Sequence, residues 1–191
     1  MAWLKRGKPR DTNALHAALR HGTWEDFQGA YQPEHVNYDG YSGDTLLTLA
    51  LAHNDSALRV KIATRLLDDG ADVTKEHPLH VLVGRNEHDF DAEAGLLQRM
   101  LDLGADINEV LPGFGTPLET AAAKFKFSDK SLTPFYDVLL ARPDIDLVQP
   151  GLDGRPVLIN LRKWYAKRGE LVERVEALLI ERGVPLPDPT K

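Results

Sequence analysis

The sequence predicts an all-α protein built from repeated units, and three observations indicate it. A first phrase recurs along the chain, at 13–16 (NALH), 45–48 (TLLT), 77–80 (HPLH), 116–119 (TPLE) and, in degenerate form, 156–159 (PVLI). A second phrase recurs downstream of the first, at 66–73 (LLDDGADV), 100–107 (MLDLGADI) and, more weakly, 139–146 and 178–183. The two phrases alternate, which is the pattern of a repeat protein whose units must stack to bury a core.

The two phrases together resemble the ankyrin repeat. The first is a variant of T-P-L-H-x-A, and the second is similar to the L-L-x-x-G-A-D end of an ankyrin unit. The resemblance implies a solenoid of about five helix-turn-helix units with short finger loops. It gives one domain over 11–186, an N-terminal extension at 1–10 and a tail at 187–191. The approximate repeats are 11–42, 43–75, 76–112, 113–152 and 153–186.

Residues with special backbone roles fit this interpretation. Asn13, Thr45 and Thr116 are expected to cap the first helix of a unit, because their side-chain oxygens can accept from a free amide. Gly70 and Gly104 are expected to end the second helix in the left-handed conformation.

The spacing of the units departs from the usual period of about 33 residues. Successive signature leucines lie 32, 32, 39 and 40 residues apart. The added residues fall between the two helices of a unit, at 85–91 and 124–130, as longer helices or as loops. Phe90, Phe125 and Phe127 in these insertions are expected to cover the lengthened units. Leu79 follows Gly70 by only nine positions, which predicts a missing or stunted finger there.

Composition narrows the classes of function. The formal net charge is -6, from 29 acidic and 23 basic residues, which argues against nucleic-acid binding because phosphates need a basic surface. There is no cysteine, so disulfides and thiol catalysis are excluded. The first ten residues lack the apolar stretch of a secretory signal, and no apolar run is long enough to span a bilayer. We therefore expect a cytoplasmic protein with no membrane partner.

The resemblance implies that partners bind at the concave helix face and at the finger loops. The first-helix positions expected to be exposed carry basic or potentially basic side chains, and a tryptophan follows the last of them: Arg20, His21, His53, Arg85, Lys124, Lys163 and Trp164. A cationic stripe on an acidic protein favours a partner with an acidic patch. The alternative is that these side chains are ordinary polar residues on a solvent-exposed helix face and bind no partner.

Two aromatic residues are candidate anchors on the fingers. Tyr41 and Phe114 fall in finger positions, and aromatic side chains are enriched at binding hot spots. The alternative is that each ring folds back over a neighbouring unit.

No pattern of catalytic, cofactor-binding or metal-binding residues is found. The chain contains no H-E-x-x-H, no G-x-x-x-x-G-K-[ST] and no G-x-S-x-G. His16 and His80 occupy the signature histidine position, where a hydrogen bond that orders the turns is expected. We therefore expect no enzyme activity, cofactor or metal.

These observations predict a non-catalytic protein–protein interaction module with one specific partner. Its small size resembles stand-alone bacterial ankyrin proteins, some of which are immunity proteins against a toxin, so an inhibitor or immunity role is one hypothesis. A regulatory adaptor of an intracellular enzyme is an alternative. A small-ligand-binding or catalytic protein that uses the inserted segments is a further one.

Overall fold

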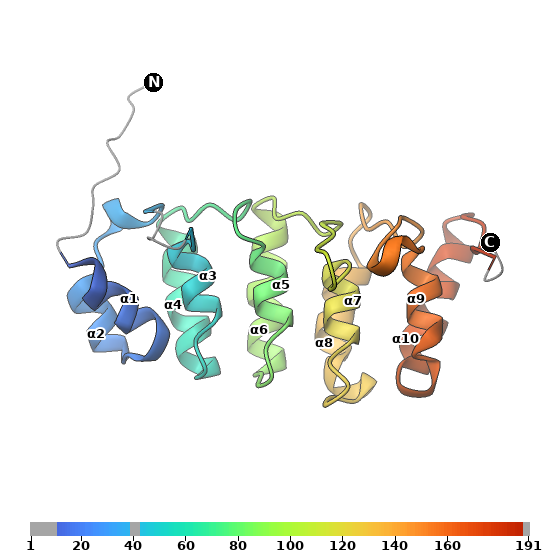
Figure 1. Cartoon of the computed structure of the whole chain (residues 1–191), viewed down its shortest axis with the longest axis horizontal. Helices are drawn as coiled ribbons and strands as arrows, with labels where there is room; N and C mark the ends of the chain where they lie inside the picture. The colour runs from blue at the N-terminus through green and yellow to red at the C-terminus, as the bar shows by residue number, and fades with distance from the viewer. Residues whose placement is uncertain (1–10, 39–42, 189–191) are drawn as a thin grey trace, which may run out of the picture. The chain divides into compact units, whose positions relative to one another are not determined.

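The computed structural model describes residues 11–38 and 43–188. These residues form ten α-helices and two short 3-10 helices, and their only β structure is isolated bridges (Figure 1). The prediction of an all-α fold is confirmed. No helix within these two ranges is long and apolar enough to cross a membrane. In chain order the helices are α1 (Thr12–His21), α2 (Trp24–Ala30), η1 (Pro33–His35), α3 (Leu46–Leu51), α4 (Ser56–Asp68), α5 (Pro78–Val83), α6 (Phe90–Asp102), α7 (Pro117–Ala122), α8 (Asp129–Leu140), η2 (Leu152–Gly154), α9 (Val157–Lys163) and α10 (Tyr165–Glu181).

The chain divides into two compact units, residues 1–105 and 106–191. In the first unit, α1 packs on α2, α3 on α4 and α5 on α6. The short helices α1, α3 and α5 also contact each other in that order, as do α2, α4 and α6. The first unit is therefore two layers of helices made from three successive helix pairs.

The second unit repeats this arrangement with two pairs. Helix α7 packs on α8 and α9 on α10, while α7 contacts α9 and α8 contacts α10. Isolated bridges join Leu111 to Gly115 and Pro150 to Pro156, so a small hairpin precedes α7 and another precedes α9. In the first unit, the described segment between α4 and α5 consists of turns with no bridge, in agreement with its shorter spacing. The single domain expected over 11–186 stays a prediction.

Helix starts follow the sequence signals at two of three positions. Thr45 and Thr116 each cap their helix in a reciprocal capping box, with Thr48 and Glu119 as the third helical residues. Helix α1 differs, because Asp11 supplies the cap by accepting from the amide of Ala14 at 2.9 Å. The prediction for Asn13 is wrong, because the helix starts one residue before it, at Thr12.

Glycines end the second helix of two pairs as expected. Gly70 and Gly104 follow α4 and α6 with φ of 88° and 100°. In this left-handed region a side chain is strained, so glycine permits the sharp turn.

The signature leucines form the core of each unit. Leu15, Leu47 and Leu79 in the first unit, and Leu118 and Leu158 in the second, are at most 1% exposed. Their burial confirms the register of the repeated phrase, because its leucine faces the interior in every helix pair.

The inserted residues are mostly loops, although 90–91 and 129–130 form the first residues of α6 and α8. Residues 84–89 join α5 to α6, and 123–128 join α7 to α8. Of the inserted phenylalanines, Phe90 lies 4.8 Å from the His88 ring, whereas Phe125 is 48% exposed and does not cover its unit.

A buried arginine holds the first of these loops. Arg59 donates to the carbonyl oxygen of His53 at 2.9 and 2.7 Å and to that of Glu87 at 3.0 Å. Its guanidinium also pairs with the carboxylate of Glu93, which contacts Nδ1 of His88 at 2.5 Å. The arginine and the glutamate are both fully buried, so their charges are balanced inside the unit.

Candidate protein-binding surfaces

A groove of about 440 Å³ runs along the first unit, and it brings together three of the predicted basic residues. We call it the inner groove. Arg20 and His21 reach it from the end of α1, and Arg85 reaches it from the segment after α5. Between them the lining is supplied mainly by α3 and by the segments that flank α3 and α5: Asp44, Thr48, Leu49, Ala52, Asn54, Glu76 and Val81.

The two arginines of the inner groove differ in how firmly they are held. Arg20 is half exposed and lies 3.5 Å from Asp44, an ion pair that contributes little stability at a surface. Arg85 donates to the amide oxygen of Asn54 at 2.7 Å, while its Nε is buried without a hydrogen-bond partner. Burial, and after it the charge of Arg59, lowers the pKa of Arg85. Arginine nevertheless stays charged at neutral pH, so the groove holds a fixed, partly desolvated cation.

His53 is not part of this exposed surface, contrary to the expectation from the sequence. It is 5% exposed, and its Nδ1 accepts from the amide of Asp55 at 3.1 Å. That contact leaves the proton on Nε2, which donates to the carbonyl oxygen of Gly22 at 3.2 Å. Helix α3 ends at Leu51, so the chain turns inward before His53 and the histidine ties two helix pairs together.

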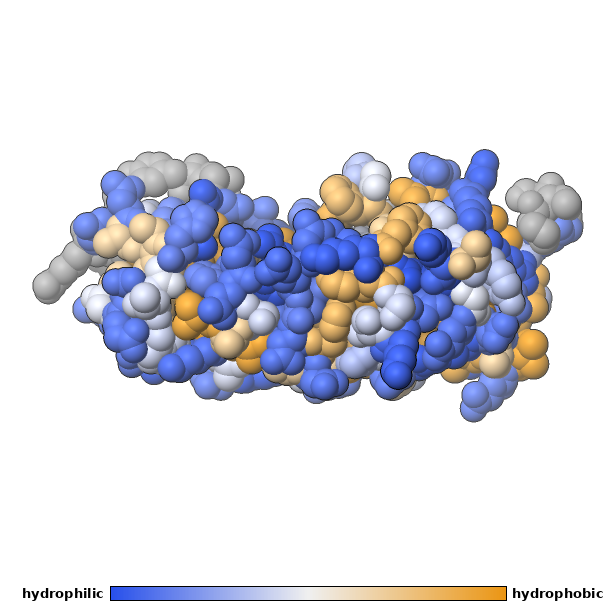
Figure 2. Space-filling model, turned by 90° about the horizontal axis from the view of Figure 1, so that it is seen from below, coloured by the Kyte–Doolittle hydropathy of each residue, from blue (hydrophilic) through white to orange (hydrophobic). Residues whose placement is uncertain are grey.

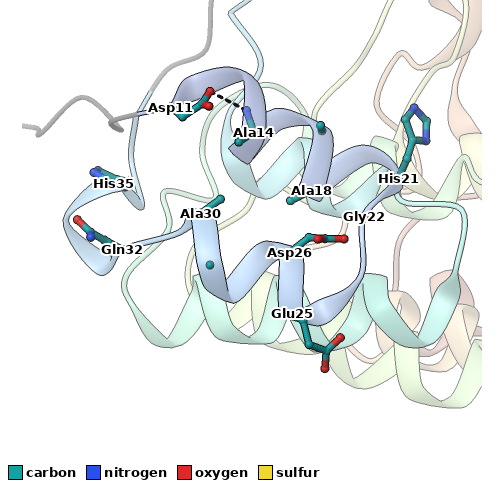
Figure 3. A pocket seen from close by; sticks show the side chains of 12 residues that line it. Asp11, Ala14, Ala18, His21, Gly22, Glu25, Asp26, Ala30, Gln32 and His35 are labelled. Carbon is teal, nitrogen blue, oxygen red and sulfur yellow. Dashed lines mark hydrogen bonds between the residues drawn. The ribbon is translucent and has the colours of Figure 1, made fainter.

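A larger hollow of about 790 Å³ lies on the face of α1 and α2 (Figure 3). Its floor consists of small residues, among them Ala14, Ala18 and Ala30. In Figure 3 the side chain of His21 projects from the end of α1, away from these alanines. His21 lines both this hollow and the inner groove, so it marks the boundary between them.

In the second unit, Lys124, Lys163 and Trp164 lie where the paired helices are joined. Trp164 packs edge-on against the ring of Phe125, with 5.6 Å between ring centroids. Lys163 is exposed and donates to the amide oxygen of Asn160 at 2.8 Å. Phe125, which the sequence predicts to cover its lengthened unit, is half exposed at the surface and packs on Trp164.

A second buried arginine fixes this region. Arg168 donates to the carbonyl oxygens of Ala122 at 2.6 Å, Lys124 at 2.8 Å and Phe127 at 3.0 Å. Its acidic partner is Asp129, at 3.4 Å. Arg168 is fully buried, so its guanidinium holds the loop after α7 from inside the unit.

Of the two aromatic residues predicted on the fingers, the structure describes Phe114 but not Tyr41. Phe114 is 59% exposed in the hairpin between Leu111 and Gly115, so its ring does not fold back over the unit. This exposure favours the anchor interpretation over the packing alternative. Tyr41 lies outside the described residues.

Glu119 occupies the signature histidine position of its unit and is fully buried. It accepts from the amides of Thr116 at 2.8 Å and Leu152 at 3.1 Å, and from the side-chain amide of Asn160 at 2.8 Å. It therefore joins α7 to the hairpin before α9. The expected ordering hydrogen bond is absent at Nε2 of His16, which is buried without a partner.

The described part of the chain contains no group of three or more acidic or histidine side chains arranged to hold a metal ion.

No protein-family model matches the sequence, and no curated protein matches it either. Among solved structures, a functionally unknown protein from Leptotrichia buccalis C-1013-b is similar, with a TM-score of 0.66 and 19% sequence identity. The match covers 92% of this chain and 97% of that one. At this identity the similarity concerns the fold alone.

Proposed function

We propose that this protein is a non-catalytic, ankyrin-type binding module whose partner presents an acidic patch to the inner groove. The observation that carries the proposal is the convergence of Arg20, His21 and Arg85 on one groove of a chain whose net charge is -6. Asp44 and Glu76 also line the groove, so the formal charges balance there when His21 is neutral, and the attraction for an acidic patch comes from direct contacts with Arg20 and Arg85.

The alternating phrases and the paired helices support the ankyrin assignment. Two helix layers with glycine turns after α4 and α6 are what stacked helix-pair units require. The exposed Phe114 in the second unit adds a candidate aromatic anchor.

The partner's identity defines the narrower role. An inhibitor or immunity protein would bind a toxin, and a regulatory adaptor would bind an enzyme of the same cell. Both roles belong to a cytoplasmic setting and both use the same surface chemistry. We favour the inhibitor role, because this chain resembles small stand-alone ankyrin proteins, some of which are immunity proteins.

The test is capture from native lysate by two tagged forms of the protein, followed by quantitative mass spectrometry. The wild type is compared with the variant Arg20→Glu, Arg85→Glu, whose helical content is first checked by circular dichroism. A matched control reverses two charges outside the groove, Lys61→Glu with Lys75→Glu. The proposal expects a stoichiometric protein with the wild type and the control, and its loss with the groove variant. Equal recovery with all three forms contradicts the groove as the site.

A further inference from the structure

Basic and aromatic side chains gather at one end of the helices of the second unit. The segments 122–128 and 160–168 contain six basic residues and no acidic residue, although the chain as a whole is acidic. Two of the six, Arg162 and Arg168, are engaged with Glu176 and Asp129. The other four are lysines, at 124, 126, 163 and 167. Of these, Lys163 donates to the amide oxygen of Asn160 at 2.8 Å, and Nζ of Lys126 lies 5.5 Å from the centroid of the Phe127 ring.

The two segments form one surface. The rings of Phe125 and Trp164 meet edge to face at 5.6 Å, one from each segment. Arg168 donates to the carbonyl oxygens of both Lys124 and Lys167, at 2.8 and 3.1 Å, and its guanidinium lies 5.5 Å from the Phe125 ring. We call this surface the lysine–aromatic cluster: Lys124, Phe125, Lys126, Lys163, Trp164 and Lys167.

The cluster has a rigid backbone beneath an exposed rim. Arg168 is fully buried and fixes the backbone carbonyls of Lys124 and Lys167. Above it, Phe125 is 48% exposed, and Lys126, Lys163 and Lys167 are exposed. Figure 2 looks onto the ends of the helices where the joining loops lie, and it shows apolar orange atoms set among hydrophilic blue ones. The fixed backbone therefore loses little conformational entropy on binding, whereas the exposed lysine side chains still lose rotamer freedom.

We infer that the lysine–aromatic cluster is a second docking surface, which takes an acidic peptide segment carrying an apolar or aromatic side chain. Carboxylates of the segment pair with the lysines, and its apolar side chain packs on Phe125 and Trp164. This inference rests on the proposed function, since the segment belongs to the protein partner. The net charge of -6 favours an acidic peptide over a nucleic acid, because the larger charge of a phosphate backbone is repelled more strongly by the rest of the chain.

The cluster is tested separately from the inner groove by selecting random peptides of on the order of twelve residues on the full-length protein. The expected result is enrichment of peptides rich in Asp and Glu with one or more aromatic or aliphatic residues. The best peptide is then labelled and titrated by fluorescence anisotropy. The variant Lys126→Glu, Lys167→Glu is expected to weaken its binding by about tenfold or more, because two attractive charges become repulsive. This variant leaves Phe125, Trp164 and Arg168 in place, so we expect the fold to be preserved.

Two comparisons separate the possible outcomes. The inner-groove variant Arg20→Glu, Arg85→Glu is expected to bind the selected peptide as the wild type does. If this variant loses the peptide and the cluster variant retains it, the peptide docks in the groove, which overturns the cluster and supports the proposed function. Failure to enrich acidic peptides, or binding of an oligothymidylate that the peptide cannot displace, also overturns the inference. If the cluster variant loses both the peptide and the captured protein partner while the groove variant retains both, the cluster stands and the proposed groove falls. If neither variant changes binding of the captured partner, the cluster is not a docking surface for that partner and the inference is overturned.

Discussion

Arg59 of α4 forms an ion pair with Glu93 of α6, and neither side chain is exposed to solvent. The pair links two successive helix pairs of the first unit, and the same guanidinium holds the carbonyl oxygens of His53 and Glu87. A buried pair of this kind is expensive to break, because removing one partner leaves the other charge uncompensated.

We therefore expect Arg59→Leu to destabilise the protein by about 3–5 kcal/mol. The measurement is urea denaturation followed by tryptophan fluorescence and by circular dichroism. Arg65→Leu is the matched control on the same helix, since Arg65 is exposed and pairs with Asp69 four residues on. The control is expected to cost roughly 0.5 kcal/mol. Equal losses for the two variants would show that the buried pair does not stabilise the unit.

The backbone of Gly151 lies so close to the carboxylate of Glu119 that only glycine fits there. A Cβ at this position would overlap the buried carboxylate of Glu119, whose hydrogen bonds leave it little room to move. We expect Gly151→Ala to cost on the order of 1–3 kcal/mol through overpacking.

Gly169→Ala is the control for this prediction. A Cβ at Gly169 would make only ordinary contacts with the Tyr165 ring, at 3.6 Å and beyond. In a helix, alanine is favoured over glycine by roughly 0.5–1 kcal/mol, so this variant is expected to melt at or above the wild-type temperature. Thermal melts of the two variants check the prediction, which fails if both behave alike.

His16 gives the stability a dependence on pH. Burial, and after it the charge of Arg20, lowers the pKa of His16 from its ordinary value of 6.5. The unfolded chain therefore takes up this proton before the folded protein does, so stability falls as pH decreases below 6.5 and levels off below the folded pKa. We expect His16→Gln to lose less stability than the wild type between neutral pH and about pH 5. Denaturation series at several pH values would refute this if the two slopes coincide.

Substitution of Phe114 tests whether the finger before α7 contacts the partner. Its ring is 59% exposed, so Phe114→Ser removes little core packing and is expected to leave the melting temperature unchanged. If the ring is a binding anchor, the same variant weakens binding of the captured partner by more than about 1 kcal/mol. Calorimetric titration of wild type and variant decides, and equal affinities would assign Phe114 to the solvated surface.

The sequence predicts the features that depend on local chemistry. The threonine caps of α3 and α7, the glycine turns after α4 and α6 and the buried signature leucines all follow from short-range patterns. His53 was misassigned because its exposure was inferred from a helix that ends two residues earlier, at Leu51.

The buried arginines depend on contacts that no local pattern reveals. Arg59 and Glu93 are 34 residues apart, and Arg168 and Ala122 are 46 apart. A signal was nevertheless present in the helical spacing. Arg59 lies three, four and seven residues before apolar positions that are all buried, and Arg168 has the same spacing to the buried residues of α10. A basic residue on an apolar helix face therefore predicts burial with a partner, even when the partner stays unidentified.

The measurement that tests the central claim most directly is amide hydrogen exchange of the protein alone and saturated with its captured partner. If the partner occupies the inner groove, exchange slows in the segments that border it, 43–54 and 76–86, and stays unchanged in α4 and α6 of the other layer. Slower exchange confined to α4 and α6, or no change in either layer, would contradict a partner-binding site in the groove.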